Sequence, residues 1–382
     1  MGFHEFSSPY DWSRIAAYKR TAKAAFGGMI DLSVGSPVDP VPDSVRKALA
    51  VAANDPNAYG YPATSGTADL RAAIAEWFSA ARNVDLQAIH ADVVPTVGSK
   101  EGVALMASLL HFGEDDVVVQ PKVSYPTYEI GTQLAGAQVL KVDDVADVAS
   151  WRNVPGVKAV WVNSPCNPTG EVYSAERMAG IVAAAREIGA VVLSDECYAL
   201  MQWRGATNSA DDDPLQSTPC ALRSDVCAGS AEGVLVLYSL SKQSNMAGYR
   251  TAFIAGDESL IASMSAYRKQ IGQIIPGPVQ AAMAAGLRDL ESVKVQHVRY
   301  RERLGVLVSA LRAYGYCTDM PDGALYVWVR AKSGDCWTDM EQLAKIGIIA
   351  SPGEFYGAPE CLRFSATASD EAIASAAERL AR

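Results

Sequence analysis

The stretch "GVLVLYSLSK" (residues 233–242) is almost entirely apolar until it meets two serines and a lysine. Such a run is typical of a β-strand that is buried on both faces of a parallel sheet. Similar runs are DVVPTV (92–97), DVVVQP (116–121), AQVLKV (137–142), VKAVWVN (157–163), AVVLS (190–194) and RTAFIAGD (250–257). Helical patterns at about 99–110 and 174–188 separate some of these runs, which predicts an α/β fold with a large, doubly wound, mostly parallel sheet.

The rest of the chain predicts a second, smaller unit. Residues 278–313 form a mostly unbroken helical pattern, and the strand-like runs ALYVWVRA, IGIIASPG and CLRFSAT follow it. We therefore expect a large domain over 46–279 and a small α+β domain built from 1–45 and 280–382. The first 45 residues are loop-rich and are expected to pack on the C-terminal unit. The segment 203–233 is rich in Ser, Ala, Asp and Gly without clear periodicity, and a loop of that length is usually functional or disordered.

Composition excludes several classes of function. The 382 residues carry a net charge of −10, which disfavours nucleic acid or an anionic membrane as a main partner. No apolar stretch is long enough for a transmembrane helix, and the N-terminus lacks the pattern of a signal peptide, so the chain is expected to be cytoplasmic. The seven scattered cysteines include no CxxC pair, and the four histidines are far apart in sequence. We expect reduced cysteines and no metal site.

Polar clusters occur where the predicted strands end, which is where an open parallel sheet binds its ligands. Gly98-Ser99-Lys100 opens a helix, and free N–H groups at a helix N-terminus suit a phosphate. Other clusters contain Asn167, Asp195 and Lys242. Arg363 lies inside the apolar run CLRFSAT, where a guanidinium needs an anionic partner. A phosphate cradle, a carboxylate for a ring nitrogen, a Schiff-base lysine and an arginine for a carboxylate are what pyridoxal phosphate chemistry requires.

The order of these motifs carries a family resemblance. "NPTG" at 167–170, Asp195-x-x-Tyr198, "SLSK" with an arginine eight residues after the lysine, and the late Arg363 resemble the class I/II aminotransferases of the aspartate aminotransferase superfamily, which have fold type I. The resemblance covers nearly the whole chain. It implies pyridoxal 5'-phosphate as cofactor, and amino and keto acids as substrates.

The resemblance also implies roles for individual residues. Lys242 would hold the cofactor as a Schiff base and move the substrate proton, and Asp195 would keep the ring nitrogen protonated. Asn167 and Tyr198 would hydrogen-bond the phenolic oxygen of the cofactor, and Tyr125 would stack on its ring. The implied phosphate ligands are Ser99, Lys100 through its backbone N–H, Ser239, Ser241 and Arg250.

Substrate binding and assembly follow from the same resemblance. Arg363 would bind the substrate α-carboxylate bidentately, with the backbone of Gly35 and the side chain of Asn167 beside it. Tyr61 in "YGYPATSG" matches the family tyrosine that reaches the phosphate of a neighbouring subunit, which implies a homodimer with shared active sites. The sequence departs from the family pattern at Tyr356, which stands at a position where the family has phenylalanine.

The substrate is a finer question. "GSKEG", "SLSKQSNMAGYR" and the long segment before the lysine strand resemble the actinobacterial type of N-succinyldiaminopimelate aminotransferase. That resemblance implies transfer from glutamate to N-succinyl-2-amino-6-oxopimelate in lysine biosynthesis. Arg14, Lys19 and Arg20 are candidates for binding the second carboxylate of glutamate. Open alternatives are an aspartate, alanine or aromatic aminotransferase, or a C–S β-lyase with the same Lys and Asp. A dehydrogenase is disfavoured because no GxGxxG follows the first strand.

Overall fold

The computed structural model describes residues 10–56, 58–203 and 218–382. Its seven-stranded sheet has the order β2-β8-β7-β6-β5-β3-β4. The strands are β2 (Ala91–Val97), β3 (Val117–Pro121), β4 (Gln138–Val142), β5 (Val157–Asn163), β6 (Val191–Asp195), β7 (Val234–Ser239) and β8 (Thr251–Asp257). Only β8 runs antiparallel to its neighbours β2 and β7. The predicted mostly parallel α/β sheet is confirmed.

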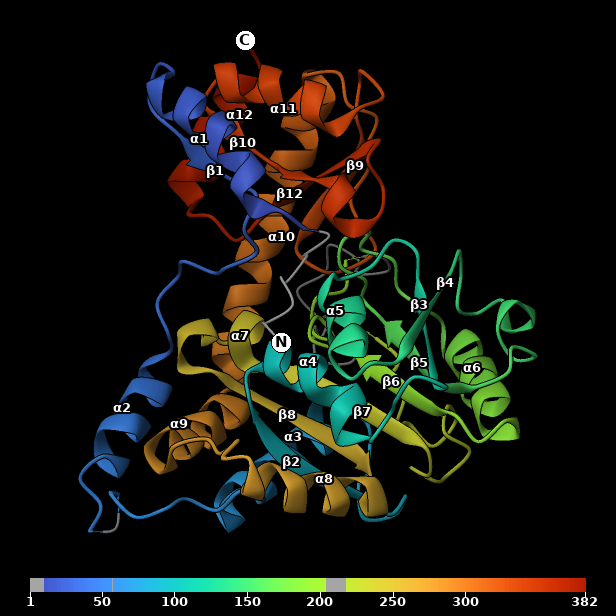
Figure 1. Ribbon diagram of the computed structural model, residues 1–382. Coiled ribbons are helices and arrows are strands. Elements are labelled where there is room, and N and C mark those ends of the chain that lie inside the picture. The colour runs from blue at the N-terminus through green and yellow to red at the C-terminus, as the bar shows by residue number, and fades with distance from the viewer. Residues whose placement is uncertain (1–9, 57, 204–217) are drawn as a thin grey trace, which may run out of the picture.

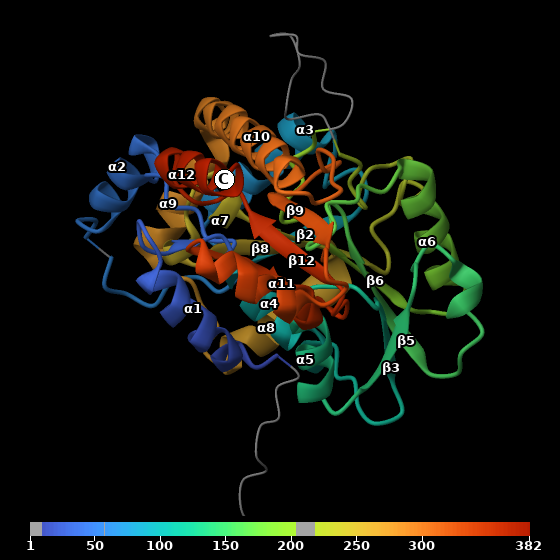
Figure 2. The ribbon, with the colours of Figure 1, turned by 90° about the horizontal axis from the view of Figure 1, so that it is seen from above.

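Helices cover this sheet on both faces (Figures 1 and 2). Those of this part of the chain are α2 (Asp43–Ala52), α3 (Ala68–Arg82), α4 (Ser99–Leu109), α5 (Thr127–Leu134), α6 (Ala175–Glu187), α7 (Leu240–Gln243), α8 (Glu258–Gln270) and α9 (Gly277–Arg288). Two clusters of buried apolar side chains form the core on either side of the sheet, one containing Trp77, Val160 and Phe253, the other Val118, Trp161 and Ile254. The continuously apolar strands therefore face side chains in both directions, as a sheet covered on both faces requires.

A smaller unit lies above the large sheet in Figure 1, and the long helix α10 (Leu290–Ala313) connects the two. It contains a three-stranded antiparallel sheet, a two-stranded parallel pair and three further helices. These elements are α1 (Ile15–Ala24), β1 (Ile30–Asp31), β9 (Tyr326–Arg330), α11 (Cys336–Lys345), β10 (Ile348–Ile349), β11 (Ser351–Pro352), β12 (Cys361–Ser365) and α12 (Asp370–Leu380). Strand β1 pairs with β10, so the N-terminal segment packs on the C-terminal unit as expected. The exact domain boundaries, 46–279 against 1–45 with 280–382, stay a prediction.

Two local expectations need correction. The pattern over 278–313 is interrupted, because α9 ends at Arg288 and Asp289 caps α10 by accepting a 3.0 Å hydrogen bond from Ser292 N. The first 45 residues are less loop-rich than expected, since they include the ten-residue helix α1. Part of the unusual segment 203–233, residues 204–217, lies outside the described residues, as do residues 1–9.

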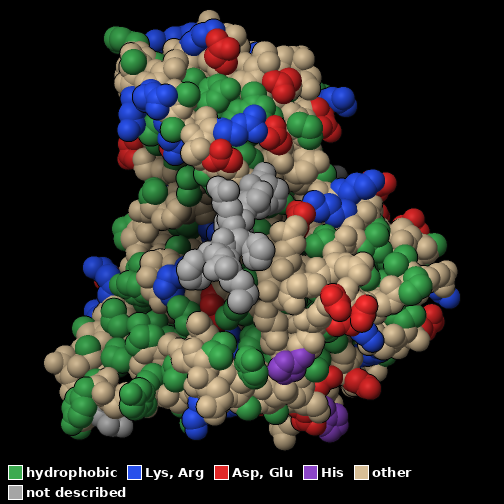
Figure 3. Space-filling model, in the orientation of Figure 1, with side chains coloured by type: hydrophobic (Ala, Val, Ile, Leu, Met, Phe, Trp, Pro, Cys, Tyr) green, Lys and Arg blue, Asp and Glu red, His purple; other side chains and the backbone are tan. Residues whose placement is uncertain are grey.

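Figure 3 shows basic and acidic side chains interspersed over one face of the molecule. No extended patch of one charge sign is visible on that face. Among the described residues, no helix is both long enough and apolar enough to span a membrane.

Candidate active site

A cavity of about 460 Å³ lies between the large sheet and the smaller unit. Its lining residues come from the carboxyl ends of the parallel strands, from the N-terminal segment and from the C-terminal unit. They are Trp12, Ser33, Val34, Gly35, Ser36, Ser99, Lys100, Tyr125, Asn167, Asp195, Cys197, Tyr198, Ser239, Ser241, Lys242, Ala247, Arg250, Tyr326, Tyr356 and Arg363. The cavity brings together the predicted cofactor-binding and α-carboxylate-binding residues except Tyr61, and it does not include the candidate cations Arg14, Lys19 and Arg20.

Topology explains why these residues meet. Ser99 follows β2, Asp195 ends β6 and Ser239 ends β7, and these parallel strands end at one edge of the sheet. Strand β8 runs the other way, so Arg250, which precedes it, reaches the same edge. An open α/β sheet binds its ligands at this edge.

Lys242 lies in α7, the short helix that directly follows β7. Its side chain is half-buried, and desolvation of the amino group lowers the Lys242 pKa from its ordinary value. The Nζ atom donates to the backbone oxygen of Gly35 on the opposite wall. A lysine with a lowered pKa is more often neutral at physiological pH, which is the state that can act as a nucleophile or base.

Asp195 is 6% exposed, and burial raises the pKa of its carboxyl above the ordinary value. The Tyr128 hydroxyl donates to its Oδ2 at 2.8 Å, and the backbone N–H of Cys197 donates to Oδ1 at 3.1 Å. No described Lys, Arg or His forms an ion pair with Asp195. A buried carboxylate without a cation is costly, so this site suits a positively charged ligand atom.

Another part of the cavity lining can hold an anion. Ser239 and Ser241 place two hydroxyl groups 2.7 Å apart, and α4 begins at Ser99 with its free N–H groups. The Arg250 guanidinium donates to Ala247 O at 2.8 Å and to Val97 O at 3.3 Å, and it lies against Gly98. A Cβ at Gly98 would lie 2.0 Å from an Arg250 nitrogen, so the glycine makes room for the guanidinium.

Arg363 lies in the middle strand of the three-stranded sheet and is 4% exposed. It donates to Asn167 Oδ1 at 2.7 Å and to the backbone oxygen of Ser33 at 2.8 Å, while its Nε has no partner. Its guanidinium carbon lies 4.0 Å from the ring centroid of Tyr326 and 4.8 Å from that of Tyr356. No described carboxylate pairs with Arg363, which leaves a buried cation ready for an anionic ligand.

Tyrosine hydroxyl groups complete the cavity. The Tyr198 and Tyr326 oxygens are 2.6 Å apart and share a hydrogen bond. Burial raises the pKa of Tyr198 well above its ordinary value, so its phenol stays protonated at neutral pH and can donate. Tyr125 also lines the cavity, with its ring edge-to-face against Tyr128.

Comparison with known proteins connects this geometry to a family. The model of the family "Aminotransferase class I and II" matches residues 27–380. The chain belongs to the class I and II aminotransferases. It is 40% identical to the 4-dedimethylamino-4-oxo-anhydrotetracycline transaminase of Streptomyces rimosus, over 97% of this chain and 98% of that protein. It is 39% identical to a probable aminotransferase of Mycobacterium tuberculosis, over 97% of this chain and 84% of that one. A probable N-succinyldiaminopimelate aminotransferase from Thermus thermophilus has a similar structure, with a TM-score of 0.81 at 27% identity over 97% of this chain and 99% of that chain.

Class I and II aminotransferases depend on pyridoxal phosphate, and the cavity of this aminotransferase fits that cofactor. Asp195 supplies the unpaired buried carboxylate for a protonated ring nitrogen. Gly98, Arg250 and the serine hydroxyls supply the anion cradle. In the described part of the chain, no group of three or more His, Cys, Asp or Glu side chains could hold a metal ion.

The structure leaves some predicted residues outside the cavity of the aminotransferase. Tyr61 is fully exposed. Arg14 pairs with Glu354 and lies 4.0 Å from the ring centroid of Trp337. Lys19 pairs with Asp31 at 2.7 Å. Neither Arg14, Lys19 nor Arg20 lines the cavity, so the N-terminal cations are not brought to the site.

Other lining residues were missed from the sequence. Trp12 reaches the cavity from the N-terminal segment, and Tyr326 reaches it from the start of β9. Neither position carries a local motif, because aromatic residues next to apolar runs are usually core residues. Tyr128, which donates to Asp195 from behind the lining, was also missed, because nothing in its local sequence distinguishes it from a core tyrosine.

Proposed function

We propose that this aminotransferase exchanges the amino group between glutamate and N-succinyl-2-amino-6-oxopimelate. The observation that carries the proposal is the charge balance of the cavity. Its described lining includes three cationic side chains, Lys100, Arg250 and Arg363, besides the Lys242 amine, against the single carboxylate of Asp195. Such a site favours ligands with several negative charges, such as a phosphorylated cofactor together with a dicarboxylic acid.

Each cation would have its own task. Arg250 would bind the cofactor phosphate together with Ser99, Ser239, Ser241 and the backbone N–H of Lys100. Arg363 would bind the α-carboxylate, because it is buried and lacks a carboxylate partner among the described residues. The ammonium group of Lys100 forms no ion pair with a described residue, and we assign it to the second carboxylate of glutamate.

The chemical step would belong to Lys242. Once bound, pyridoxal phosphate supplies the carbonyl group that takes up the amino group and the ring that accepts the electron pair released at the substrate Cα. The Lys242 amine would remove the proton from Cα and return it on the cofactor side, a role suited to its lowered pKa. Asp195 would hold the proton of the ring nitrogen in place, and Asn167 and Tyr198 would donate to the phenolic oxygen.

A second candidate acceptor is a bulky cyclic ketone. The relative from Streptomyces rimosus, with 40% identity over 97% of this chain, is by its name a transaminase of a 4-oxo-anhydrotetracycline. Trp12 is 48% exposed at the cavity and would offer an aromatic face to either a long acyl chain or a fused ring.

A single-turnover spectrum tests the proposal. The purified protein with bound cofactor is mixed with L-glutamate, and loss of the visible absorbance band is followed. The converted protein is then mixed with N-succinyl-2-amino-6-oxopimelate, oxaloacetate, pyruvate or a cyclic ketone. Return of the band with the succinylated acid alone supports the proposal. Return only with the common keto acids would establish one of the alternative aminotransferase activities. Release of pyruvate and ammonia from an added cystathionine-like substrate, without a keto acid, would establish a β-lyase.

Two variants sharpen this test. Lys242→Ala should have no turnover and no visible absorbance band, with its circular dichroism unchanged. Lys100→Gln should raise the KM for glutamate about tenfold, as expected for the loss of one charged hydrogen bond, but leave the KM for alanine unchanged. Lys158→Gln is the matched control, because it removes an exposed lysine near the start of β5, and that lysine does not line the cavity. An equal effect of Lys100→Gln on both donors would contradict the assigned role.

A further inference from the structure

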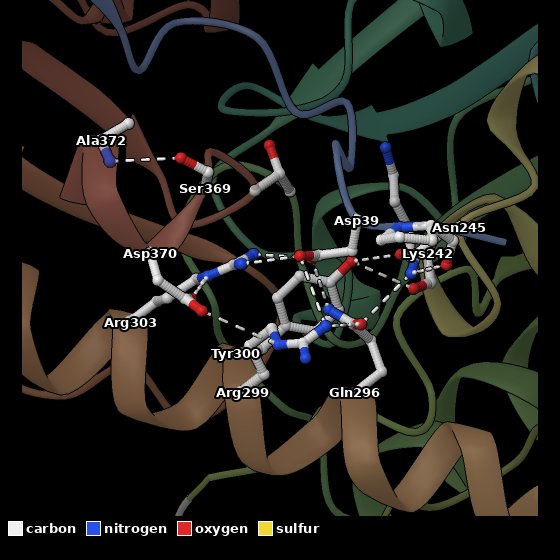
Figure 4. Close-up of polar contacts among 12 residues, drawn as sticks. Asp39, Lys242, Asn245, Gln296, Arg299, Tyr300, Arg303, Ser369, Asp370 and Ala372 are labelled. Atoms are coloured by element: carbon white, nitrogen blue, oxygen red, sulfur yellow. Dashed lines mark hydrogen bonds and ion pairs between the residues drawn. The ribbon is translucent and has the colours of Figure 1, made fainter. Parts of the chain in front are cut away.

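A polar network on the inner face of α10 links two walls of the cavity (Figure 4). Four side chains of this helix take part, at spacings that place them on one face of three successive turns. They are Gln296, Arg299, Tyr300 and Arg303. On one side they hold the backbone that follows Gly35, and on the other they hold the turn that carries Lys242.

The first side of the network is centred on Asp39, four residues after Gly35. Arg303 is 3% exposed and binds both carboxylate oxygens of Asp39, each at 2.7 Å. Gln296 Nε2 donates to the same carboxylate at 2.9 Å. Burial alone would raise the pKa of Asp39, but these hydrogen bonds outweigh it and lower that pKa below its ordinary value. A bidentate, largely buried arrangement of this kind is strong and geometrically specific.

The second side is centred on the lysine turn. The Tyr300 hydroxyl lies 3.3 Å from the backbone oxygen of Lys242 and 3.1 Å from Asn245 Oδ1, and it can donate to either. Asn245 Nδ2 donates to Gln296 Oε1 at 3.2 Å and to Pro40 O at 3.2 Å. Gln296 therefore bonds to both sides at once, through its oxygen to the lysine turn and through its nitrogen to Asp39.

A third segment joins through Arg303. Its Nε donates to Asp370 Oδ1 at 2.6 Å, at the start of α12 in the smaller unit. Arg299 guanidinium nitrogens lie 3.4 Å from Asp39 Oδ1 and 4.0 Å from Asp370 Oδ2. The positive charges of Arg299 and Arg303 therefore balance the two carboxylates of Asp39 and Asp370. Three chain segments that are far apart in sequence are thus fixed against one helix.

We infer that Asp39, Gln296 and Tyr300 are positioning residues that hold the Gly35 wall at a fixed distance from Lys242. The two walls touch inside the cavity, because Lys242 Nζ donates to Gly35 O. Outside the cavity, the network also joins the same two segments. This inference rests on the proposed roles of Lys242 as the reacting lysine and Gly35 as part of the carboxylate site.

Two single-residue variants test the Asp39 side and the lysine-turn side of the network separately. Asp39→Asn removes the charge that Arg303 binds, and Tyr300→Phe removes only one hydroxyl group. Two matched controls make the same chemical changes away from the network. They are Tyr314→Phe, directly after the end of α10, and Asp319→Asn, whose carboxylate pairs with Arg312 in the last turn of α10. The double variant Asp39→Asn/Tyr300→Phe tests whether the sides are coupled.

The measurements are steady-state kinetics with glutamate, the dissociation constant of pyridoxal phosphate, and backbone hydrogen exchange in the cofactor-free protein. Asp39→Asn should raise the KM about tenfold with a smaller change in kcat, because the Gly35 wall loses its anchor. Tyr300→Phe should lower kcat about threefold with a smaller change in KM, because the lysine turn shifts. Exchange should increase at residues 33–38 in both variants, although the hydrogen bonds of Tyr300 go to Lys242 and Asn245 and not to that segment.

Coupling makes the double variant informative. If the network acts as one unit, the double variant loses less kcat/KM than the product of the two single losses. Independent, multiplicative losses, or exchange that rises uniformly over the chain as in global destabilisation, would overturn the inference. So would single variants that match their controls. Failure of the proposed roles looks different in the wild-type protein itself: without Lys242 as the reacting lysine it would bind no cofactor through Lys242, and with another acceptor its absorbance band would return only with that acceptor.

Discussion

At the scale of single residues, the cavity contains two buried charges that lack opposite charges among the described residues. Asp195 has no cation and Arg363 has no carboxylate, although both are less than a tenth exposed. Burying an unpaired charge is costly, and natural proteins tolerate that cost mainly where a ligand supplies the missing partner. Asp195 therefore suits a cationic ring atom of the ligand, and Arg363 suits an anionic carboxylate.

Replacing Asp195 tests the first requirement. We expect Asp195→Asn to keep the fold and bind pyridoxal phosphate but to lose at least about 100-fold in kcat, because a neutral amide cannot hold the ring nitrogen in its protonated form. Stopped-flow absorbance with L-glutamate measures this rate. Asp115→Asn, an exposed aspartate just before β3, is the control. A near-wild-type rate in Asp195→Asn would mean that another carboxylate serves the ring.

The sequence predicted the charged residues of the site better than its aromatic ones. Lys242, Asp195 and Arg363 stand out because a charge next to an apolar strand needs an explanation. Trp12 and Tyr326 do not stand out, since an aromatic residue in or near an apolar run is ordinary core material until the tertiary structure places it at the cavity. The N-terminal cations Arg14 and Lys19 were misleading for a related reason, because sequence alone does not show that Glu354 and Asp31 pair with them.

At the scale of elements, the turn from β2 to α4 depends on one glycine. Gly98 has φ +80° and ψ 155°, a conformation that is almost restricted to glycine.

The strands around this turn were predictable from their apolar runs. The break between α9 and α10 was not, because the helical pattern continues across Asp289 and only the capping hydrogen bond ends it. Patterns of polarity fix the type of an element more firmly than its ends.

Substitution of that glycine should disturb the anion cradle. We expect Gly98→Ala to raise the dissociation constant of pyridoxal phosphate by about tenfold or more, because the new methyl group adds backbone strain and displaces Arg250. Fluorescence titration of the cofactor-free protein measures this constant. Gly113→Ala is the matched control, since its Cβ would meet no atom within 4 Å and its φ is not positive. Unchanged affinity in Gly98→Ala would place the phosphate elsewhere.

At the scale of the whole molecule, the exposure of Tyr61 bears on assembly. A fully exposed tyrosine that the family resemblance assigns to a neighbouring subunit's phosphate would become buried only in a dimer. We expect Tyr61→Ala and Lys242→Ala to complement each other when they are unfolded together and refolded. A hybrid dimer would contain one active site with both native residues, Lys242 from one subunit and Tyr61 from the other. Its activity at limiting cofactor should therefore exceed that of either variant alone. Additive activity without recovery would contradict shared sites.

His297 predicts how stability depends on pH. Its side chain is 8% exposed and packs against Trp203, with ring centroids 4.6 Å apart, and burial lowers its pKa from 6.5 to about 4. The unfolded chain therefore binds a proton near pH 6.5 that the folded protein takes up only near pH 4. His297 contributes stability above pH 6.5 and loses that contribution, up to about 3 kcal/mol, as the pH falls through this window.

Urea unfolding of the cofactor-free protein at pH 7 and pH 5 checks this expectation. The wild-type protein should lose free energy of unfolding between the two pH values. His297→Phe keeps an aromatic ring but cannot titrate, so its loss should be smaller by about 1–2 kcal/mol. An identical pH dependence in both proteins would show that His297 does not contribute to it.

The origin of the cavity walls has a consequence for how such enzymes diversify. The aspartate ends a strand of the large sheet and the lysine lies in the short helix that follows the next strand, whereas Trp12 and Tyr356 come from short 3₁₀ helices in the N-terminal and C-terminal segments. The surface that would meet the variable part of a substrate is thus carried on separable, peripheral chain segments. Exchange of residues 10–24 between relatives would alter substrate preference while the chemical machinery stays intact, which makes this segment a natural unit for recombination and for engineering new acceptors.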